Sequence, residues 1–372
     1  MVRVWCFWLL LGGLIYVGGG MAQGVDGISQ PQPLKYNPAF DGIGPKVYVL
    51  PPPKTAQELL EERYIRKWQS LSQVEHTIAF MEMQKQLIYL PEPERPLGIR
   101  EVDWEIFSEK QRLDRALLYY TTHPDYYALA QIQNNLGNYY FLEGNLIQAD
   151  SLYKSSLTHT RHFGADSTKA AVLDNLIRLK LRLRDYESAL NYFQQLLDRP
   201  GLESNLDYQA SLFLEIAKIE SSLGHYAAAQ RIGLNKSITL FKRTGNFKGI
   251  VRSLNVLASF MEQQNKYVEA KWYYLQAIDV AKENEDDIGL ACSLYHLASL
   301  KNTIGDYSLA VADFKQAGAL AETLSMKVLL LKVKNELGDS YLKLGDYTAA
   351  NLLLEEYNHI KTDLLQQTMR IN

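Results

Sequence analysis

Cysteine is almost absent from this sequence, which has two among its 372 residues, Cys6 and Cys292. Cys6 lies in an apolar stretch near the N-terminus, so Cys292 is expected to be alone in the mature chain. A protein with one cysteine has no internal disulfide framework, and packing must stabilise its fold. A lone cysteine inside a helix is usually a small buried hydrophobe, and we expect that role for Cys292.

An excess of charge of one sign is also missing. The formal net charge is −3, with 22% charged residues, which excludes the basic footprint of a nucleic-acid partner. Long hydrophobic runs are missing beyond the N-terminus, where residues 4–17 follow a positive start and lead to small residues ending at Ala22. This layout predicts a secretory signal peptide over residues 1–22, and we expect export to a bacterial periplasm. An uncleaved N-terminal anchor, the only expected route to a membrane, is the alternative.

Motifs of catalysis and cofactor binding are missing as well. The sequence contains no Gly-x-Ser-x-Gly elbow, no phosphate loop and no Cys-x-x-Cys pair. His159 and His162 are three residues apart, but no further ligand stands at the spacing of a metal site. We therefore expect a protein that is not an enzyme and that binds no cofactor and no metal.

What the sequence does contain is one short phrase repeated six times at a spacing of about 40 residues. A helix-breaking pair is followed by an aromatic residue or leucine and, three residues later, by alanine. The alanines are Ala149, Ala189, Ala229, Ala270, Ala310 and Ala350. A second position in the same register is small except at Ile177: Gly137, Ile177, Ala217, Ala258, Ala298 and Gly338. This period predicts stacked helical hairpins, each of which buries its apolar face against its neighbours.

Each part of the phrase has an expected structural role. Gly or Asn supplies a left-handed end for the first helix of a hairpin (helix A), and Asp or Asn caps the second (helix B). The alanine is expected where the two helices cross, because a larger side chain would push them apart.

The remainder of the chain is organised around this array. Residues 23–54 are rich in proline and predict an extended or mobile tether. Thr55 and Glu58 form a possible capping box for one long helix that reaches Leu90, and a second helix is expected over residues 104–121. The expected domains are listed in order: signal peptide 1–22, linker 23–54, N-terminal helical extension or cap 55–124, six hairpins 125–363 and C-terminal tail 364–372.

The phrase resembles the tetratricopeptide repeat. The run Leu136-Gly137-x-x-Tyr140 is followed by Gly144-Asn145-Leu146-x-x-Ala149, and the last unit has the same pattern. The period is longer than the usual 34 residues, and the proline that normally closes each unit is missing. The resemblance implies an all-α, right-handed α-α superhelix, here with an N-terminal helical extension.

In such arrays the A helices line a concave surface, which the resemblance implies is the binding groove for a protein or peptide. The implied contact residues are Gln131, Asn134, Asn138, Asp174, Arg178, Arg182, Lys218, Arg252, Asn255, Ser259, Tyr295, Ser299, Asn302, Lys332, Asn335 and Asp339. Asparagine offers both a donor and an acceptor, which suits an extended peptide backbone. Four of them lie in three successive units and are expected to form a basic strip: Arg178, Arg182, Lys218 and Arg252. The alternative is that these side chains are solvated surface.

We therefore expect an exported scaffold or adaptor that binds a protein or peptide partner in its concave groove. The sequence does not identify this partner. A membrane-associated sensory or regulatory input module is the alternative.

Overall fold

The computed structural model describes residues 35–36, 48–49, 54–92, 94–97, 99–101, 105, 107–163 and 166–369. The expected signal peptide lies outside these residues, as does most of the expected linker. Two short strands within the linker, β1 (Lys35–Tyr36) and β2 (Tyr48–Val49), pair antiparallel. In the described part of the chain, no helix is long and apolar enough to span a bilayer.

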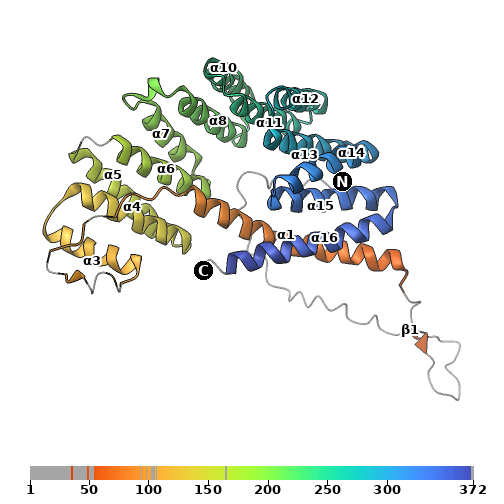
Figure 1. The fold of residues 1–372 in the computed structure, drawn as a ribbon, viewed down its shortest axis with the longest axis horizontal. Coiled ribbons are helices and arrows are strands. Elements are labelled where there is room, and N and C mark those ends of the chain that lie inside the picture. The colour runs from red at the N-terminus through yellow and green to blue at the C-terminus, as the bar shows by residue number, and fades with distance from the viewer. Residues whose placement is uncertain are drawn as a thin grey trace.

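The fold is an all-α right-handed solenoid that curves into an arch (Figure 1). The described residues contain six hairpins. The hairpins are α4 (Tyr126–Leu142) with α5 (Leu146–His159), α6 (Asp166–Arg182) with α7 (Tyr186–Leu197), α8 (Leu206–Ser222) with the interrupted helix α9 (Tyr226–Ile232), η4 (Gly233–Ile238) and α10 (Thr239–Thr244), α11 (Phe247–Gln263) with α12 (Tyr267–Glu283), α13 (Asp287–Ile304) with α14 (Tyr307–Thr323), and α15 (Lys327–Leu344) with α16 (Tyr347–Met369). The short helices η2 (Thr160–His162) and η3 (Leu202–Ser204) lie in connections.

The left-handed residue expected at the end of each helix A is confirmed. The residues at these six helix ends all have positive φ: Gly144, Arg184, Gly224, Asn265, Gly305 and Gly345. Arg184 adopts φ 57° although it has a Cβ, so the turn survives without glycine. The next residue caps helix B through its side chain at Asn145, Asp185 and Asp346. Asp306 makes no such bond, so the expected cap is absent there.

The six repeat alanines are all 0% exposed, as expected for helix crossings. Gly137 shows how close the helices come, because a Cβ there would lie 2.5 Å from Cε1 of Tyr153. Ile177, the exception to the small-residue rule, is also buried, at 3% exposure. The two helices of each hairpin therefore pack closely where they cross, but the residues that make this contact differ between units.

The N-terminal extension consists of α1 (Ala56–Gln86) and α3 (Glu109–Thr122). The predicted capping box of Thr55 and Glu58 is present and begins α1. Ser108 and Gln111 form a second capping box, so α3 begins at Glu109 and not at residue 104. Helix α3 packs against α4, where Leu113 and Ala116 contact the cluster around Ile132 and Leu136. This helix therefore covers the exposed end of the first hairpin.

Helix α1 does something different, because it folds back on the last hairpin. Its residues Leu60 and Tyr64 pack with Ala350 and Leu354 of α16. With 31 residues it is about 45 Å long and continues from α16 toward α4 and α6 (Figure 1). The extension thus joins both ends of the array, beyond the cap role that the sequence predicts.

Two further predicted boundaries are wrong. The helix expected to reach Leu90 ends at Gln86, and Leu87 is extended at φ −66° and ψ 137°. The expected tail from residue 364 instead continues α16 to Met369. Leu364 explains this second difference, because it is buried in a cluster with Val74 and Ile78 of α1 and extends the contact between the helices.

Candidate functional site

The inner face of the array is partly covered by the chain itself. Near α15, the Lys67 ammonium pairs with Asp339 at 3.0 Å. Near α6, Arg178 Nη1 donates to Gln86 Oε1 at 3.0 Å, and Arg182 Nη1 contacts Met83 Sδ at 3.1 Å. Asp339, Arg178 and Arg182 all belong to the predicted concave surface. Their partners are residues of α1.

Four buried asparagines on α4 and α6, which we call the asparagine ladder, hold the segment after α1. They are Asn134, Asn135, Asn138 and Asn175, each 0–1% exposed. Ile88 N–H donates to Asn175 Oδ1 at 3.0 Å, and Asn175 Nδ2 donates back to Ile88 O at 2.8 Å. Leu90 and Asn135 make the same pair of bonds at 2.9 and 2.7 Å. Asn134 and Asn138 each add a bond to Ile88 O at 3.0 Å.

The asparagine ladder is held in place by its own bonds. Asn175 Nδ2 donates to Asn134 Oδ1 at 2.9 Å, and Asn134 Nδ2 donates to Asn135 Oδ1 at 3.1 Å. The Tyr153 hydroxyl donates to Asn138 Oδ1 at 2.7 Å. These bonds orient the amides before any chain is placed against them, which favours recognition of main chain.

Sequence reasoning selected Asn134 and Asn138 and missed Asn135 and Asn175. The missed pair occupies one repeat position, since Asn135 stands two residues before Gly137 and Asn175 stands two residues before the equivalent Ile177. That register was the available signal. The repeat register could not show that Ile88 and Leu90 would lie against these two asparagines.

Half-buried acidic groups lie elsewhere on the concave face, on α11 and α15. Burial raises the pKa of Glu262 to about 7, and Tyr274 bonds to this carboxyl. Burial also raises the pKa of Glu336, which accepts the hydroxyl bond of Tyr295. The neighbouring His296 has its pKa lowered to about 4 by burial and by Lys332, so it is neutral near pH 7.

A hollow of about 520 Å³, the concave hollow, lies between α1 and helices α13, α15 and α16. Its lining is Glu82, Lys85, Cys292, Tyr295, His296, Ser325, Met326, Lys327, Val328, Leu329, Lys332 and Leu364. Two of these residues, Tyr295 and Lys332, were predicted from the sequence. The half-buried Cys292 has its pKa raised by burial, which disfavours the reactive thiolate.

The remaining predicted residues are not gathered into one surface. Asn255 Nδ2 donates to Ser293 at 2.8 Å, and Asn302 accepts from Ser340 at 3.0 Å, so both join neighbouring units. Asp174 accepts a bond from Tyr208 at 3.2 Å. The others are buried Gln131, Ser259 with a bond to Val256 O, Ser299 bonded to Glu336, and half-buried Asn335.

The expected basic strip is divided. Arg178 and Arg182 contact α1, whereas Lys218 pairs with Glu215 at 2.7 Å. Arg252 is exposed. The four side chains therefore do not present one continuous positive surface.

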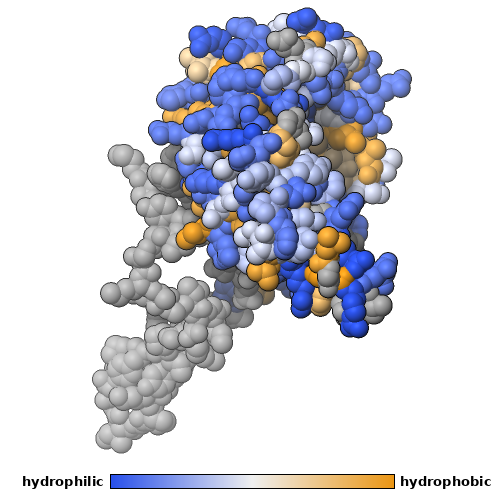
Figure 2. Space-filling model, turned by 90° about the vertical axis from the view of Figure 1, so that its left-hand side faces the viewer, coloured by the Kyte–Doolittle hydropathy of each residue, from blue (hydrophilic) through white to orange (hydrophobic). Residues whose placement is uncertain are grey.

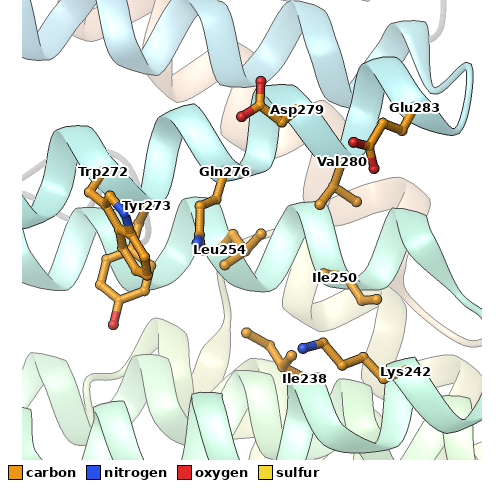
Figure 3. A pocket seen from close by; sticks show the side chains of 10 residues that line it. All are labelled: Ile238, Lys242, Ile250, Leu254, Trp272, Tyr273, Gln276, Asp279, Val280 and Glu283. Carbon is orange, nitrogen blue, oxygen red and sulfur yellow. The ribbon is translucent and has the colours of Figure 1, made fainter.

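A second cleft of about 540 Å³ lies on the outer side, between the interrupted third helix B and α12. Trp272 and Tyr273 lie at one end, and Lys242 and Glu283 lie at the other (Figure 3). Its position coincides with the π-helical turn η4, which begins at Gly233. Nothing in the sequence pattern singled out this cleft.

The other surfaces that the structure describes have fewer features of a binding site. The end of the molecule near α3, α4 and α5 faces the viewer in Figure 2 and is mostly hydrophilic, with hydrophobic side chains in small separate groups. His159 and His162 stack on Tyr126, with ring centroids 5.7 and 4.1 Å away. Among the described residues, no group of three His, Cys, Asp or Glu side chains could hold a metal ion.

Comparisons with known proteins find similarity to helical-repeat proteins over parts of the chain. A tetratricopeptide repeat model matches residues 128–200, and a model of anaphase-promoting complex subunit 5 matches residues 177–264 and 251–304. The regulatory protein RapK of Bacillus subtilis is 23% identical over an alignment of 211 residues, and the match covers 53% of this chain. The match spans 56% of the length of RapK.

Two of the solved structures that are similar to this chain are a repeat protein and a Rap protein. A tetratricopeptide repeat protein from Parabacteroides merdae is 20% identical, with a TM-score of 0.47 over 72% of this chain and 93% of that one. A Rap protein complexed with competence and sporulation factor is 14% identical, with a TM-score of 0.47 over 83% and 99% of the two chains.

Proposed function

We propose that the chain is a tetratricopeptide-repeat scaffold that binds a protein or peptide partner on its concave face. The repeat is generally an interaction fold and not a catalytic one. The observation that carries the proposal is the concave hollow, which α1 leaves open between itself and the A helices.

The concave hollow combines an apolar floor with positive charge. Leu329 and Leu364 supply buried apolar surface, at 8% and 4% exposure. Its charged lining is Lys85, Lys327, Lys332 and the single carboxylate Glu82. Its volume of about 520 Å³ lies within the range of small-ligand pockets, about 300–1,000 Å³. These properties suit a short peptide segment that carries a carboxylate beside an apolar side chain.

We propose further that the scaffold works after export, in a bacterial periplasm. The support is the sequence of residues 1–22, with its positive start, apolar run and small residues before the expected cleavage at Ala22. The alternative, a sensory or regulatory module anchored through an uncleaved leader, predicts a different mature N-terminus. N-terminal sequencing of the native protein distinguishes the two, because only cleavage yields a chain that begins at Gln23.

Site-specific crosslinking tests the concave hollow. A photoreactive residue at position 85 of the full chain should crosslink a defined partner in native envelope extract, whereas one at Lys271 on the outer helix α12 should not. Lys327→Glu with Lys332→Glu should abolish the crosslink because an acidic segment would then be repelled. The control reverses exposed lysines of α12, Lys271→Glu with Lys282→Glu, and should leave it intact. Equal crosslinking from positions 85 and 271 would contradict the proposal.

A further inference from the structure

We propose that the asparagine ladder is a binding site for the main chain of an extended peptide, which residues 87–90 occupy in cis and a partner peptide can take over. This inference rests on the proposed partner-binding role and specifies how one segment of that partner is recognised. The ligand class is an extended peptide with free N–H groups at alternate residues and an apolar side chain just before the first of them.

The bonding pattern supports recognition of main chain. Ile88 and Leu90 each exchange an N–H and a C=O bond with one asparagine, Asn175 and Asn135 respectively. Residues two apart in an extended chain present these groups on the same side. The asparagine side chains therefore treat residues 88–90 much as a neighbouring β-strand would. None of these four bonds depends on the side chain of the bound segment, and neither do the two that Asn134 and Asn138 add to Ile88 O.

The bound segment adds one side-chain anchor. Leu87 is 7% exposed and packs in the cluster that contains Phe141, Val172 and Leu176. Tyr89, in contrast, is 43% exposed. Leu90 precedes Pro91, which favours the extended backbone that the asparagine ladder requires. The site thus selects for an apolar residue at the position of Leu87 and for extended conformation after it.

Exchange of this segment does not require release of the whole extension. Helix α1 is held at its other end, where the Tyr64 hydroxyl donates to Ala350 O at 2.8 Å and Lys67 pairs with Asp339. A free peptide must compete with an attached segment whose effective concentration is on the order of millimolar. An empty asparagine ladder would leave buried amides without partners, which favours direct replacement by another peptide.

The test uses the full chain and a labelled ten-residue peptide with the sequence of residues 83–92. Ile88→Pro with Leu90→Pro removes the two N–H donors that face Asn175 and Asn135, and so weakens the cis segment. Fluorescence anisotropy should show this variant binding the peptide at least tenfold more tightly than the wild-type chain does. The same peptide N-methylated at the residues equivalent to Ile88 and Leu90 keeps its side chains and should not bind.

Substitutions in the asparagine ladder complete the design. Added to the proline variant, Asn175→Ala should weaken peptide binding at least tenfold, whereas Asn191→Ala, at an exposed asparagine of α7, should not. Circular dichroism checks that each variant folds. Leu87→Asp provides a second opened variant, which loses the buried apolar anchor but retains both N–H donors.

The outcomes separate clearly. Equal binding of the natural and N-methylated peptides, or no effect of Asn175→Ala, would overturn main-chain recognition. Failure of both opened variants to bind the natural peptide would overturn the site altogether. Neither result affects the crosslink expected at position 85. Loss of that crosslink with intact peptide binding would contradict partner binding in the concave hollow and would still support peptide binding by the asparagine ladder.

Discussion

At the residue scale, the array depends on small side chains at helix crossings and on left-handed turn residues. These features are local, so they can be predicted from spacing alone. The repeat alanines are all fully buried, and each predicted turn residue has positive φ. Arg184 and Asn265 show that geometry, and not glycine itself, is what the turn requires, since both adopt φ near 57–58°.

Ala310→Leu should destabilise the array because the alanine is 0% exposed at the crossing of its hairpin. Overpacking of this kind costs about 1–3 kcal/mol of unfolding free energy. Ala227→Leu, at an exposed position of α9, is the matched control and should change it by no more than about 0.5 kcal/mol. Urea unfolding measures both variants. If the two midpoints shift equally, the crossing role of Ala310 is wrong.

At the scale of helices, the inner faces of α11 and α15 each hold a carboxyl group whose pKa is raised by burial. The pKa of Glu262 is raised to about 7, and that of Glu336 is raised as well. In both cases burial is the main cause, and bonds from tyrosine hydroxyls oppose it only in part. The packing of these A helices therefore includes a group that titrates near neutral pH.

The sign of the pH effect follows from the direction of the shift. Glu262 binds its proton more tightly in the folded chain than in the unfolded one, whose ordinary pKa is 4.5. Its favourable contribution is fully present below about pH 4.5 and is lost as the pH rises through about 7.

Glu262→Gln mimics the protonated form and should stabilise the fold at pH 8, by about 1–3 kcal/mol. At pH 5 the variant and the wild-type chain should differ little. Thermal melts across this range measure the difference, with Glu269→Gln on the exposed side of α12 as the control. Glu336 remains in the variant, so some pH dependence of the same sign should persist. A variant destabilised equally at both pH values would show that the carboxylate itself is required.

At the scale of the whole molecule, α1 connects the last hairpin to the first two. This contact could not be predicted, because its partners are far apart in sequence and α1 lacks the repeat pattern. Lys67 and Asp339, for example, are separated by 272 residues. The early end of α1 has the same origin: Ile88 gives its N–H to Asn175 and not to the helix. Hairpins were therefore predictable from their period, whereas the occupied concave face was not.

Gly338→Ala should loosen the docking of α1, because a Cβ on Gly338 would meet the hydroxyl of Tyr64. That hydroxyl is buried and donates to Ala350 O at 2.8 Å, so it has little freedom to move. We expect a loss of about 1–3 kcal/mol, and faster hydrogen exchange in α1 than in α13. Gly318→Ala is the matched control, since its Cβ would lie 3.3 Å from Val333 Cγ1, and a slight shift accommodates it.

The cooperativity of unfolding, measured as the steepness of the urea transition, provides a second test on the same variants. In an open solenoid each repeat contacts only its neighbours, so the two ends can unfold separately. Docked α1 couples the ends, and the wild-type chain should unfold in one steep urea transition. Gly338→Ala should lower the steepness as well as the midpoint, because weaker docking lets one end unfold before the other. An unchanged slope with a lower midpoint would mean that α1 stabilises the last hairpin without coupling it to the first two.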